Sequence, residues 1–330
     1  FGDTFFFFVS QRRFGAVCSA STMTTPSKKE ASVIGGGPCG SLLAMFLVEA
    51  GYEVDVYELR PEEEAEEAGG VLGKAASATK RSINFALSHR GICALRELGL
   101  DQEILAESVE MHSRYVHLAD GSVAEQRYGG PGEAIYSVSR PDVVGLLEKA
   151  ARRRGAVYHH GHKLVGFEEA STKPQFEVAG GVITAKGGGP TFGCDGAFSA
   201  TRRLLERRGR YDTKVWFATQ GYKELHIPPN AQGGYVFPPN YLHIWPRGDN
   251  MLIALPNKGG SFTATVFANC GELEEMERSW SREQVEEWFT SNFGDVRPHM
   301  PSLLEDWFAN PAAPLLQLQV APWHFKKDRV

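Results

Sequence analysis

Three glycines near the start of the chain have the spacing of a phosphate-binding turn. Gly35, Gly37 and Gly40 lie in "VIGGGPCGSLLAMF", between a short apolar run and a stretch with helical spacing. The first glycine permits a tight turn, the second lets the backbone approach a pyrophosphate, and the third lets the helix pack closely on the strand. Glu58 follows at the end of a second strand, where a carboxylate accepts hydrogen bonds from an adenosine ribose. This βαβ context predicts a dinucleotide site for FAD or NAD, since Glu58 would repel the 2′-phosphate of NADP. A purely structural glycine turn is the alternative.

A second candidate is the stretch "GCDGAFSATR" at 193–202, which follows a predicted strand at 191–194. Asp195, Gly196 and Arg202 could lie beside a cofactor. Asp195-Gly196 could equally form a type I turn before a helix, with Arg202 in solvent. The residues alone leave both interpretations open.

Composition excludes several classes of function. The net charge of −5 and the pI near 6.1 provide no basic field for nucleic acid. His159, His160 and His162 have no acidic partner at metal-ligand spacing, so we expect no metal site. No apolar run approaches the 18 residues of a membrane span. The five cysteines are odd in number and widely spaced, which favours reduced thiols; they are Cys18, Cys39, Cys93, Cys194 and Cys270.

The remaining pattern predicts an α/β half followed by a β-rich half. Helical spacing recurs in "HRGICALRELGL", "DQEILAES" and "RPDVVGLLEKAARRRG", with strands expected at 114–119, 122–128 and 135–139. From about 205 onward, strand-like segments separated by Pro, Asn and Gly predict an antiparallel sheet with one covered face. "EQVEEWFTSNF" and "PSLLEDWFAN" are expected to be amphipathic helices that pack on it. The acidic segment 61–78 is expected to be an exposed loop.

Both ends of the chain are unusual. Residues 1–30 are rich in Ser, Thr and Arg, which suits a transit peptide, but we favour translated upstream sequence with Met23 as the true start. The chain stops at "HFKKDRV" without a capping signal, and we expect it to be an N-terminal part of a longer protein.

The order of motifs resembles one family along nearly the whole chain. "GCDGAFSATR" is similar to the Asp-Gly motif of the FAD-dependent aromatic-ring hydroxylases (class A). "RSINFALSHRG" and "PNYLHIWPR" resemble the kynurenine 3-monooxygenases within that family. The chain departs from their pattern at 61–78, at the glycine-rich 186–190, and in the part beyond Val330.

This resemblance implies a fold and a domain order. The expected class is α/β, a Rossmann-like FAD-binding domain interleaved with an antiparallel β-sheet substrate domain. FAD-binding segments are expected at 31–113 and 140–204, and substrate-domain segments at 114–139 and 205–330.

The resemblance also implies site residues. No residue is expected to be catalytic, because the flavin carries the chemistry. Arg114 is the expected anchor for a substrate carboxylate, with Tyr128 beside it. Tyr241, His243 and Trp245 are expected on one face, as the floor of the substrate chamber. Cofactor contacts are expected from Gly35, Gly37, Cys39, Gly40, Tyr57, Glu58, Leu59, Arg60, Ala86, Arg140, Leu164, Asp195, Gly196 and Arg202.

The implied reaction is hydroxylation of L-kynurenine to 3-hydroxykynurenine with NADPH and O₂, through a flavin C4a-hydroperoxide, in tryptophan catabolism and NAD biosynthesis. The alternatives are another flavin hydroxylase acting on a phenol or quinone precursor, or an inactive flavin-binding fragment. We expect the 330-residue chain alone to be soluble, to bind FAD weakly and to be inactive. The full-length eukaryotic protein is expected on the cytosolic face of the mitochondrial outer membrane, held by a C-terminal part that this chain lacks.

Overall fold

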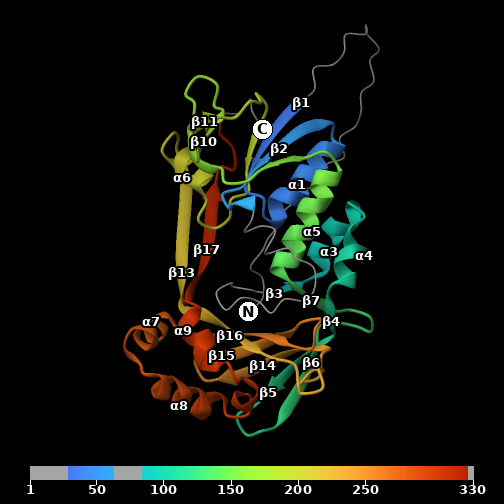
Figure 1. Ribbon diagram of the computed structural model, residues 1–330, viewed down its shortest axis with the longest axis vertical. Helices are drawn as coiled ribbons and strands as arrows, with labels where there is room; N and C mark the ends of the chain where they lie inside the picture. The colour runs from blue at the N-terminus through green and yellow to red at the C-terminus, as the bar shows by residue number, and fades with distance from the viewer. Residues whose placement is uncertain (1–28, 63–83, 326–330) are drawn as a thin grey trace.

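The computed structural model describes residues 29–62 and 84–325 (Figure 1). The N-terminal extension with Met23, most of the acidic segment 61–78 and the last five residues lie outside this part, so the predictions made for them are not addressed.

A parallel sheet forms the first layer. Its strand order is β12-β1-β2-β8, with every neighbouring pair parallel. The strands are β1 (Lys29–Ile34), β2 (Tyr52–Tyr57), β8 (Val157–His159) and β12 (Thr191–Gly193). Carboxyl ends of parallel strands meet at one edge, so the residues after β1, β2 and β12 lie together.

Helices α1 (Pro38–Glu49) and α5 (Arg140–Arg153) pack on this sheet. Helices α3 (His89–Glu97) and α4 (Asp101–Ala106) contribute buried side chains to the same core. Pro38 at the first helical position favours the start of α1, because its fixed φ suits a helix and its missing N–H is not needed there. Val33, Val56 and Ala44 are fully buried between the layers.

Two smaller antiparallel sheets flank this region. One contains β9 (Lys163–Phe167), β10 (Pro174–Val178) and β11 (Gly181–Thr184). The other contains β3 (Asn84–Leu87), β4 (Val109–Met111) and β7 (Ile135–Ser139). Helix α6 (Ala200–Glu206) follows β12.

The largest sheet has seven strands in the order β17-β13-β16-β15-β14-β5-β6. It is antiparallel except between β14 and β5, which run parallel. Its strands are β5 (Ser113–His117), β6 (Val123–Arg127), β13 (Asp212–Ile227), β14 (Tyr241–Arg247), β15 (Asn250–Pro256), β16 (Phe262–Asn269) and β17 (Ala313–Ala321).

One face of this sheet is covered by α7 (Cys270–Ser279), α8 (Arg282–Phe293), η1 (Arg297–His299) and α9 (Leu303–Ala309). A capping box between Ser281 and Gln284 begins α8. Phe289 and Trp307 from these helices contact each other and belong to one buried cluster with Trp245 of β14. We call this the helix face of the sheet.

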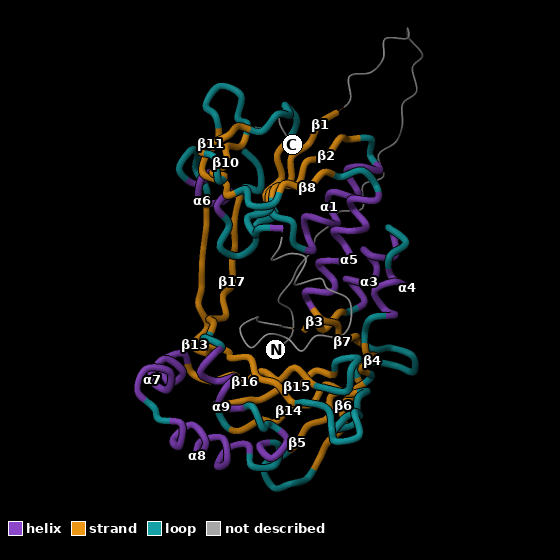
Figure 2. Tube along the Cα trace, in the orientation of Figure 1, coloured by secondary structure: helices purple, strands orange, loops and turns teal. Residues whose placement is uncertain are grey.

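The opposite face, here called the inner face, carries Arg114, Leu242 and Thr263. Arg114 and Leu242 are register partners in β5 and β14, so their side chains share a face. Thr263 alternates with Phe262 and Ala264, which lie in the core under the helices. Asn84 of β3 donates to Asn257 and accepts from Thr263, which places the β3-β7-β4 sheet against the inner face. Figure 2 shows these small strands between the large sheet and α5.

Strands β13 and β17 form a long ribbon from the large sheet toward the parallel sheet (Figure 1). Val215, Trp216 and Phe217 are consecutive on β13, and all three side chains are exposed. The ribbon therefore has no covering layer in the described part of the chain.

The predicted α/β fold with a second, mainly antiparallel sheet is confirmed. The structure also differs from the prediction. The β14–β5 pair is parallel, and the segment 135–139 pairs with β3 and β4 instead of joining the large sheet. The elements that were not predicted are α7, β3, β4, β9, β10, β11 and β17. In β7, Ser137 and Val138 are buried against α5 and β3, and this packing was not visible in the local pattern.

Candidate functional site

The glycine turn after β1 has the geometry that its sequence predicts. Gly35 has a φ of 101°, and a Cβ there would lie 2.6 Å from the carbonyl oxygen of Cys194. A Cβ at Gly40 would lie 1.9 Å from the carbonyl oxygen of Gly35. A Cβ at Gly37 would meet no atom within 4 Å, so this position is open. Two of the glycines are thus required by close packing and the third leaves room for a ligand.

The first turn of α1 leaves backbone donors available. Gly37 is the N-cap residue and makes no side-chain capping bond. Ser41 N–H donates to the carbonyl of Gly37. Among the described residues, none accepts a hydrogen bond from the N–H groups of Gly37, Cys39 or Gly40. Such N–H groups at the positive end of a helix attract a phosphate.

Glu58 lies beside this turn at the end of β2 and is 7% exposed. Its Oε2 accepts from the N–H of Gly36 at 2.7 Å, and its Oε1 accepts from the backbone and side chain of Arg60. Burial alone would raise the pKa of Glu58, but the bonds and charge of Arg60, together with Gly36, lower the pKa below its usual value. The carboxylate is therefore ionised at neutral pH. Oε2 keeps a lone pair that a ribose hydroxyl could use.

The Asp-Gly stretch lies against the glycine turn, because β12 pairs with β1. The Asp195 carboxylate accepts from Ser199 Oγ at 2.5 Å and from Thr201 N–H at 2.9 Å, so it supports the start of α6, whose N-cap residue is Ser199. The Arg202 guanidinium donates to the carbonyl of Ala197 and lies 3.5 Å from Glu206. Asp195 and Arg202 thus make their described contacts within the turn and its helix, and their contact with a cofactor stays a prediction. Gly196, with a φ of 80°, is the residue that makes this turn possible.

Two thiols lie near the turn. Burial raises the pKa of Cys39 to about 11 and that of Cys194 to about 12. Both thiols are therefore protonated at neutral pH, and neither is a ready nucleophile.

The other predicted cofactor residues fall into two groups. Tyr57 and Leu164 are buried in a small core between the parallel sheet and β9–β11, where the Tyr57 ring stacks on Phe176 at 4.1 Å. Leu59 is 60% exposed beside them. Ala86 and Arg140 lie on or next to the β3-β7-β4 sheet, with the guanidinium of Arg140 5.7 Å from the Phe85 ring.

These observations fit a dinucleotide such as FAD. Free N–H groups and an open Gly37 suit the pyrophosphate, and an ionised Glu58 suits the ribose. The structure brings Gly35, Glu58 and Asp195 to one edge of the parallel sheet.

The two predicted substrate residues lie together on the inner face. The guanidinium carbon of Arg114 is 5.2 Å from the centre of the Tyr128 ring. No described carboxylate pairs with Arg114. The Tyr128 hydroxyl is buried and has no hydrogen-bond partner in the described part of the chain. Burial raises the pKa of Tyr128 more than Arg114 lowers it, so the hydroxyl remains a donor. A buried hydroxyl without a partner suits a site that a ligand completes.

The prediction that three residues of β14 form the floor of the substrate chamber is wrong. Tyr241, His243 and Trp245 do share a face, but it is the helix face. His243 contacts Phe262 and is 0% exposed, and Trp245 lies in the core under α8. The alternation of β14 places Leu242 and Ile244 on the inner face with Arg114 instead. The alternation of side chains along β14 was predicted correctly. The sequence of the strand does not indicate which face of the sheet the helices cover.

Two histidines of the 159–162 cluster have acidic neighbours that the sequence did not indicate. His159 lies 2.6 Å from Asp55, and His160 lies 2.8 Å from Glu148. No group of metal-ligating side chains occurs within residues 29–62 and 84–325. None of the helices described there could cross a membrane.

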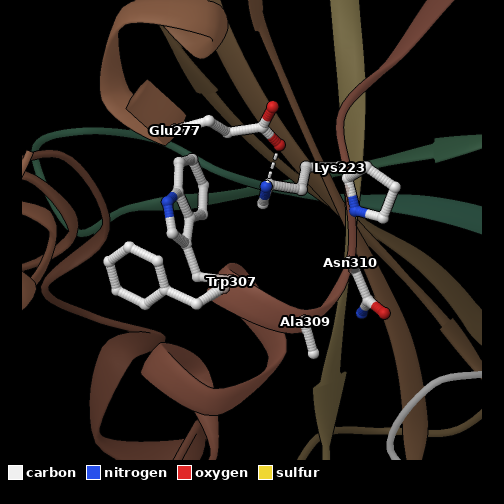
Figure 3. Close-up of a pocket in the computed structure, with 7 residues that line it drawn as sticks. Lys223, Glu277, Trp307, Ala309 and Asn310 are labelled. Carbon is white, nitrogen blue, oxygen red and sulfur yellow. Dashed lines mark hydrogen bonds and ion pairs between the residues drawn. The ribbon is translucent and has the colours of Figure 1, made fainter. Parts of the chain in front are cut away.

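Two cavities lie away from the glycine turn. One, of about 330 Å³, is bordered by the loop at 129–133, next to Tyr128. The other, of about 380 Å³, lies under the large sheet between α7 and α9 (Figure 3). There Lys223, 1% exposed, points at Glu277 and lies 4.6 Å from the centre of the Trp307 ring. Glu277 also accepts from the N–H of Ala312. This ion pair ties α7 to the strand ends of β13 and β17, and no sequence motif marked it.

Comparisons with known proteins agree with this geometry. Residues 28–220 match the family described as FAD binding domain. The chain is 36% identical over 297 residues to a kynurenine 3-monooxygenase of Flavobacterium johnsoniae, covering 89% of this chain and 64% of that relative. It is 36% identical over 312 residues to a kynurenine 3-monooxygenase of Sus scrofa, covering 91% of this chain and 61% of that relative. The chain thus spans less than two thirds of the length of these relatives.

Among solved structures, the tetrameric form of 2-methyl-3-hydroxypyridine-5-carboxylic acid oxygenase has a similar fold. The TM-score is 0.66 at 16% identity, covering 90% of this chain and 72% of that chain. At this identity the likeness concerns the fold alone. With the family match covering the parallel sheet, the glycine turn and Glu58, the conclusion is that this chain belongs to the FAD-binding domain family.

Proposed function

We propose that the chain is the FAD-binding and substrate-binding part of a monooxygenase that converts L-kynurenine to 3-hydroxykynurenine with NADPH and O₂. Relatives named kynurenine 3-monooxygenase, from bacteria, an insect, a mammal and an amoeba, support this proposal. Because the chain spans only part of their length, the activity is proposed for the full-length protein.

The observation that carries the proposal is the pairing of Arg114 with Tyr128 on the inner face. Kynurenine is an amino acid with an aniline ring, so its site needs a carboxylate anchor next to an aromatic surface. A guanidinium without a carboxylate partner among the described residues offers two parallel donors to a substrate carboxylate. The Tyr128 ring contacts the guanidinium, and its hydroxyl is available to the ligand.

The cofactor would be held by the edge of the parallel sheet. The N–H groups of Gly37, Cys39 and Gly40 would bind the pyrophosphate, and Glu58 would accept from the ribose. When bound and reduced by NADPH, FAD would activate O₂, so that one oxygen atom is transferred to the substrate ring and the other leaves as water. Glu58 and Arg60 together fix the adenosine end, which sets where the rest of the cofactor lies.

The inner face would position the substrate and exclude water. Leu242 and Ile244 present apolar side chains beside Arg114, and an apolar floor keeps water from the reacting atoms. The amino group of the substrate activates its own ring, so the chain needs no general base near Arg114. Because burial raises the pKa of Cys39 and Cys194, both thiols stay protonated and neither is assigned a role in the reaction.

A labelling experiment tests the proposal. Full-length protein with FAD, NADPH and L-kynurenine would be incubated under ¹⁸O₂, and the product analysed by mass spectrometry. We expect 3-hydroxykynurenine carrying one ¹⁸O atom. Turnover of a phenol instead of kynurenine would favour another aromatic hydroxylase, and a protein without bound flavin would exclude the whole class.

We also propose the cytosolic face of the mitochondrial outer membrane as the location of the full-length protein, as the resemblance implies. Fractionation of cells expressing the full-length protein tests this. Recovery in the soluble fraction would contradict it.

A further inference from the structure

The glycine turn is held from behind by two hydroxyl groups. Ser41 lies in the first turn of α1 and is 0% exposed, and Tyr158 of β8 is 7% exposed. The Tyr158 hydroxyl donates to Ser41 Oγ at 2.8 Å. Ser41 Oγ in turn donates to the carbonyl oxygen of Gly36 at 3.2 Å. The three groups form a directed chain that ends on the peptide between Gly36 and Gly37.

That peptide carries a donor for the phosphate. A trans peptide is planar, with its C=O and N–H pointing in opposite directions. Fixing the Gly36 carbonyl on Ser41 therefore turns the Gly37 N–H to the opposite side of this peptide. That N–H has no acceptor among the described residues, and a Cβ at Gly37 would meet no atom within 4 Å. The Gly36 N–H is fixed separately by Glu58.

Tyr158 packs beside the glycine turn. A Cβ added at Gly36 would lie 3.4 Å from Cε1 of its ring, and the Arg152 guanidinium lies 5.0 Å from its ring centre. Burial raises the pKa of Tyr158 well above its usual value, so the hydroxyl stays protonated and can donate. With Tyr158 as its donor, Ser41 has its own proton free for Gly36.

We propose that Tyr158 and Ser41 are positioning residues for the cofactor pyrophosphate, acting in series to aim the Gly37 N–H. This inference rests on the proposed FAD site and names a part of it that no motif marks. Neither residue touches the cofactor. Their effect is to make the glycine turn rigid before the ligand arrives, which reduces the ordering that binding requires.

The test is FAD affinity of the full-length protein, measured by quenching of FAD fluorescence, beside the melting temperature of the apoprotein. Because one oriented hydrogen-bonding group is lost, we expect Y158F to raise the Kd by about five- to tenfold. S41A should raise it at least as much. Since the groups act in series, the double variant should bind FAD no more weakly than S41A alone. Y52F, a tyrosine at the amino end of β2 in the same sheet, is the matched control and should leave the Kd unchanged.

The outcomes separate the possibilities. A merely structural role would lower the melting temperature of Y158F without changing its Kd below that temperature, which would overturn the inference. Independent, additive effects of the two substitutions would overturn the series arrangement. If the wild-type full-length protein does not bind FAD, the cofactor assignment is overturned as well. If it binds FAD and Y158F binds with the same affinity, this inference alone is overturned.

Discussion

The carboxylate of Glu58 accepts a hydrogen bond of 2.7 Å from the N–H of Gly36. The two residues follow adjacent strands: Glu58 comes directly after β2, and Gly36 lies in the turn after β1. This bond connects the part of the site proposed for the ribose to the part proposed for the phosphates. A change at Glu58 is therefore expected to affect the binding of both groups.

Glu58 is expected to control cofactor affinity. E58Q keeps the shape but loses the charge, and charge-assisted hydrogen bonds are roughly twice as strong as neutral ones. We expect FAD affinity to fall about tenfold in E58Q and further in E58A. E49Q, at the far end of α1, is the control. Equal FAD affinity for E58Q and wild type, measured by fluorescence titration, would contradict the assignment.

Arg114 is expected to control substrate affinity in the full-length protein. Hydrogen bonds to a charged group contribute about 1.5–3 kcal/mol, so R114A should raise the KM for kynurenine by about 10- to 100-fold. R114K should be intermediate, because an ammonium cannot offer two parallel donors.

Arg127 provides the control for Arg114. Its side chain is 69% exposed and lies 3.9 Å from Glu125 of the same strand, β6, which pairs with the strand of Arg114. R127A should leave the KM unchanged in steady-state assays. A larger effect of R127A than of R114A would place the carboxylate anchor elsewhere.

Stability is expected to fall in mild acid because of His243. Burial lowers the pKa of His243 to about 4, while its Nε2 contacts the carbonyl of Pro238 and its Nδ1 lies 2.9 Å from Nε2 of His117. The unfolded chain binds the proton near pH 6.5 but the folded chain does not, so stability is full above pH 6.5. It is then lost as the pH falls toward 4, by roughly 3 kcal/mol.

Urea denaturation at several pH values checks this expectation. In H243F the ring is kept and the titrating group removed, so the loss between pH 6.5 and 4 should become smaller, even if the variant is less stable at neutral pH. An unchanged pH dependence in H243F would assign the effect to other groups.

Loss of Glu277 is expected to destabilise the protein more than loss of Lys223, its partner in the ion pair under the large sheet. E277Q leaves Lys223 almost fully buried without a charge partner and should lower the free energy of unfolding by about 2–3 kcal/mol. K223M replaces the ammonium by an apolar group of similar length and should cost less, because Glu277 is 31% exposed and can reach water. Chemical denaturation of both variants would show which loses more free energy of unfolding. A greater loss in K223M would show that the ammonium itself stabilises the sheet.

Sequence predicted the parts of this molecule that depend on local pattern. The glycine turn, the strand before it and Glu58 are within 30 residues of one another, and their spacing alone determines the βαβ unit. The resemblance to known hydroxylases also named Arg114 and Tyr128, which the structure brings within 5.2 Å of each other across two strands.

Other features depend on contacts that no short pattern contains. Tyr158 reaches Ser41 from 117 residues away. Lys223 looks like an ordinary strand residue until α7 and α9 cover it. For Tyr241, His243 and Trp245, alternation predicted a shared face, but the choice of face depends on where the later helices pack.

The most direct test of the proposed function is the rate of NADPH oxidation by the FAD-loaded full-length protein, with and without L-kynurenine. We expect kynurenine to accelerate NADPH oxidation strongly, with 3-hydroxykynurenine formed, and R114A to require far more kynurenine for the same rate. A rate that kynurenine does not change would contradict the proposal.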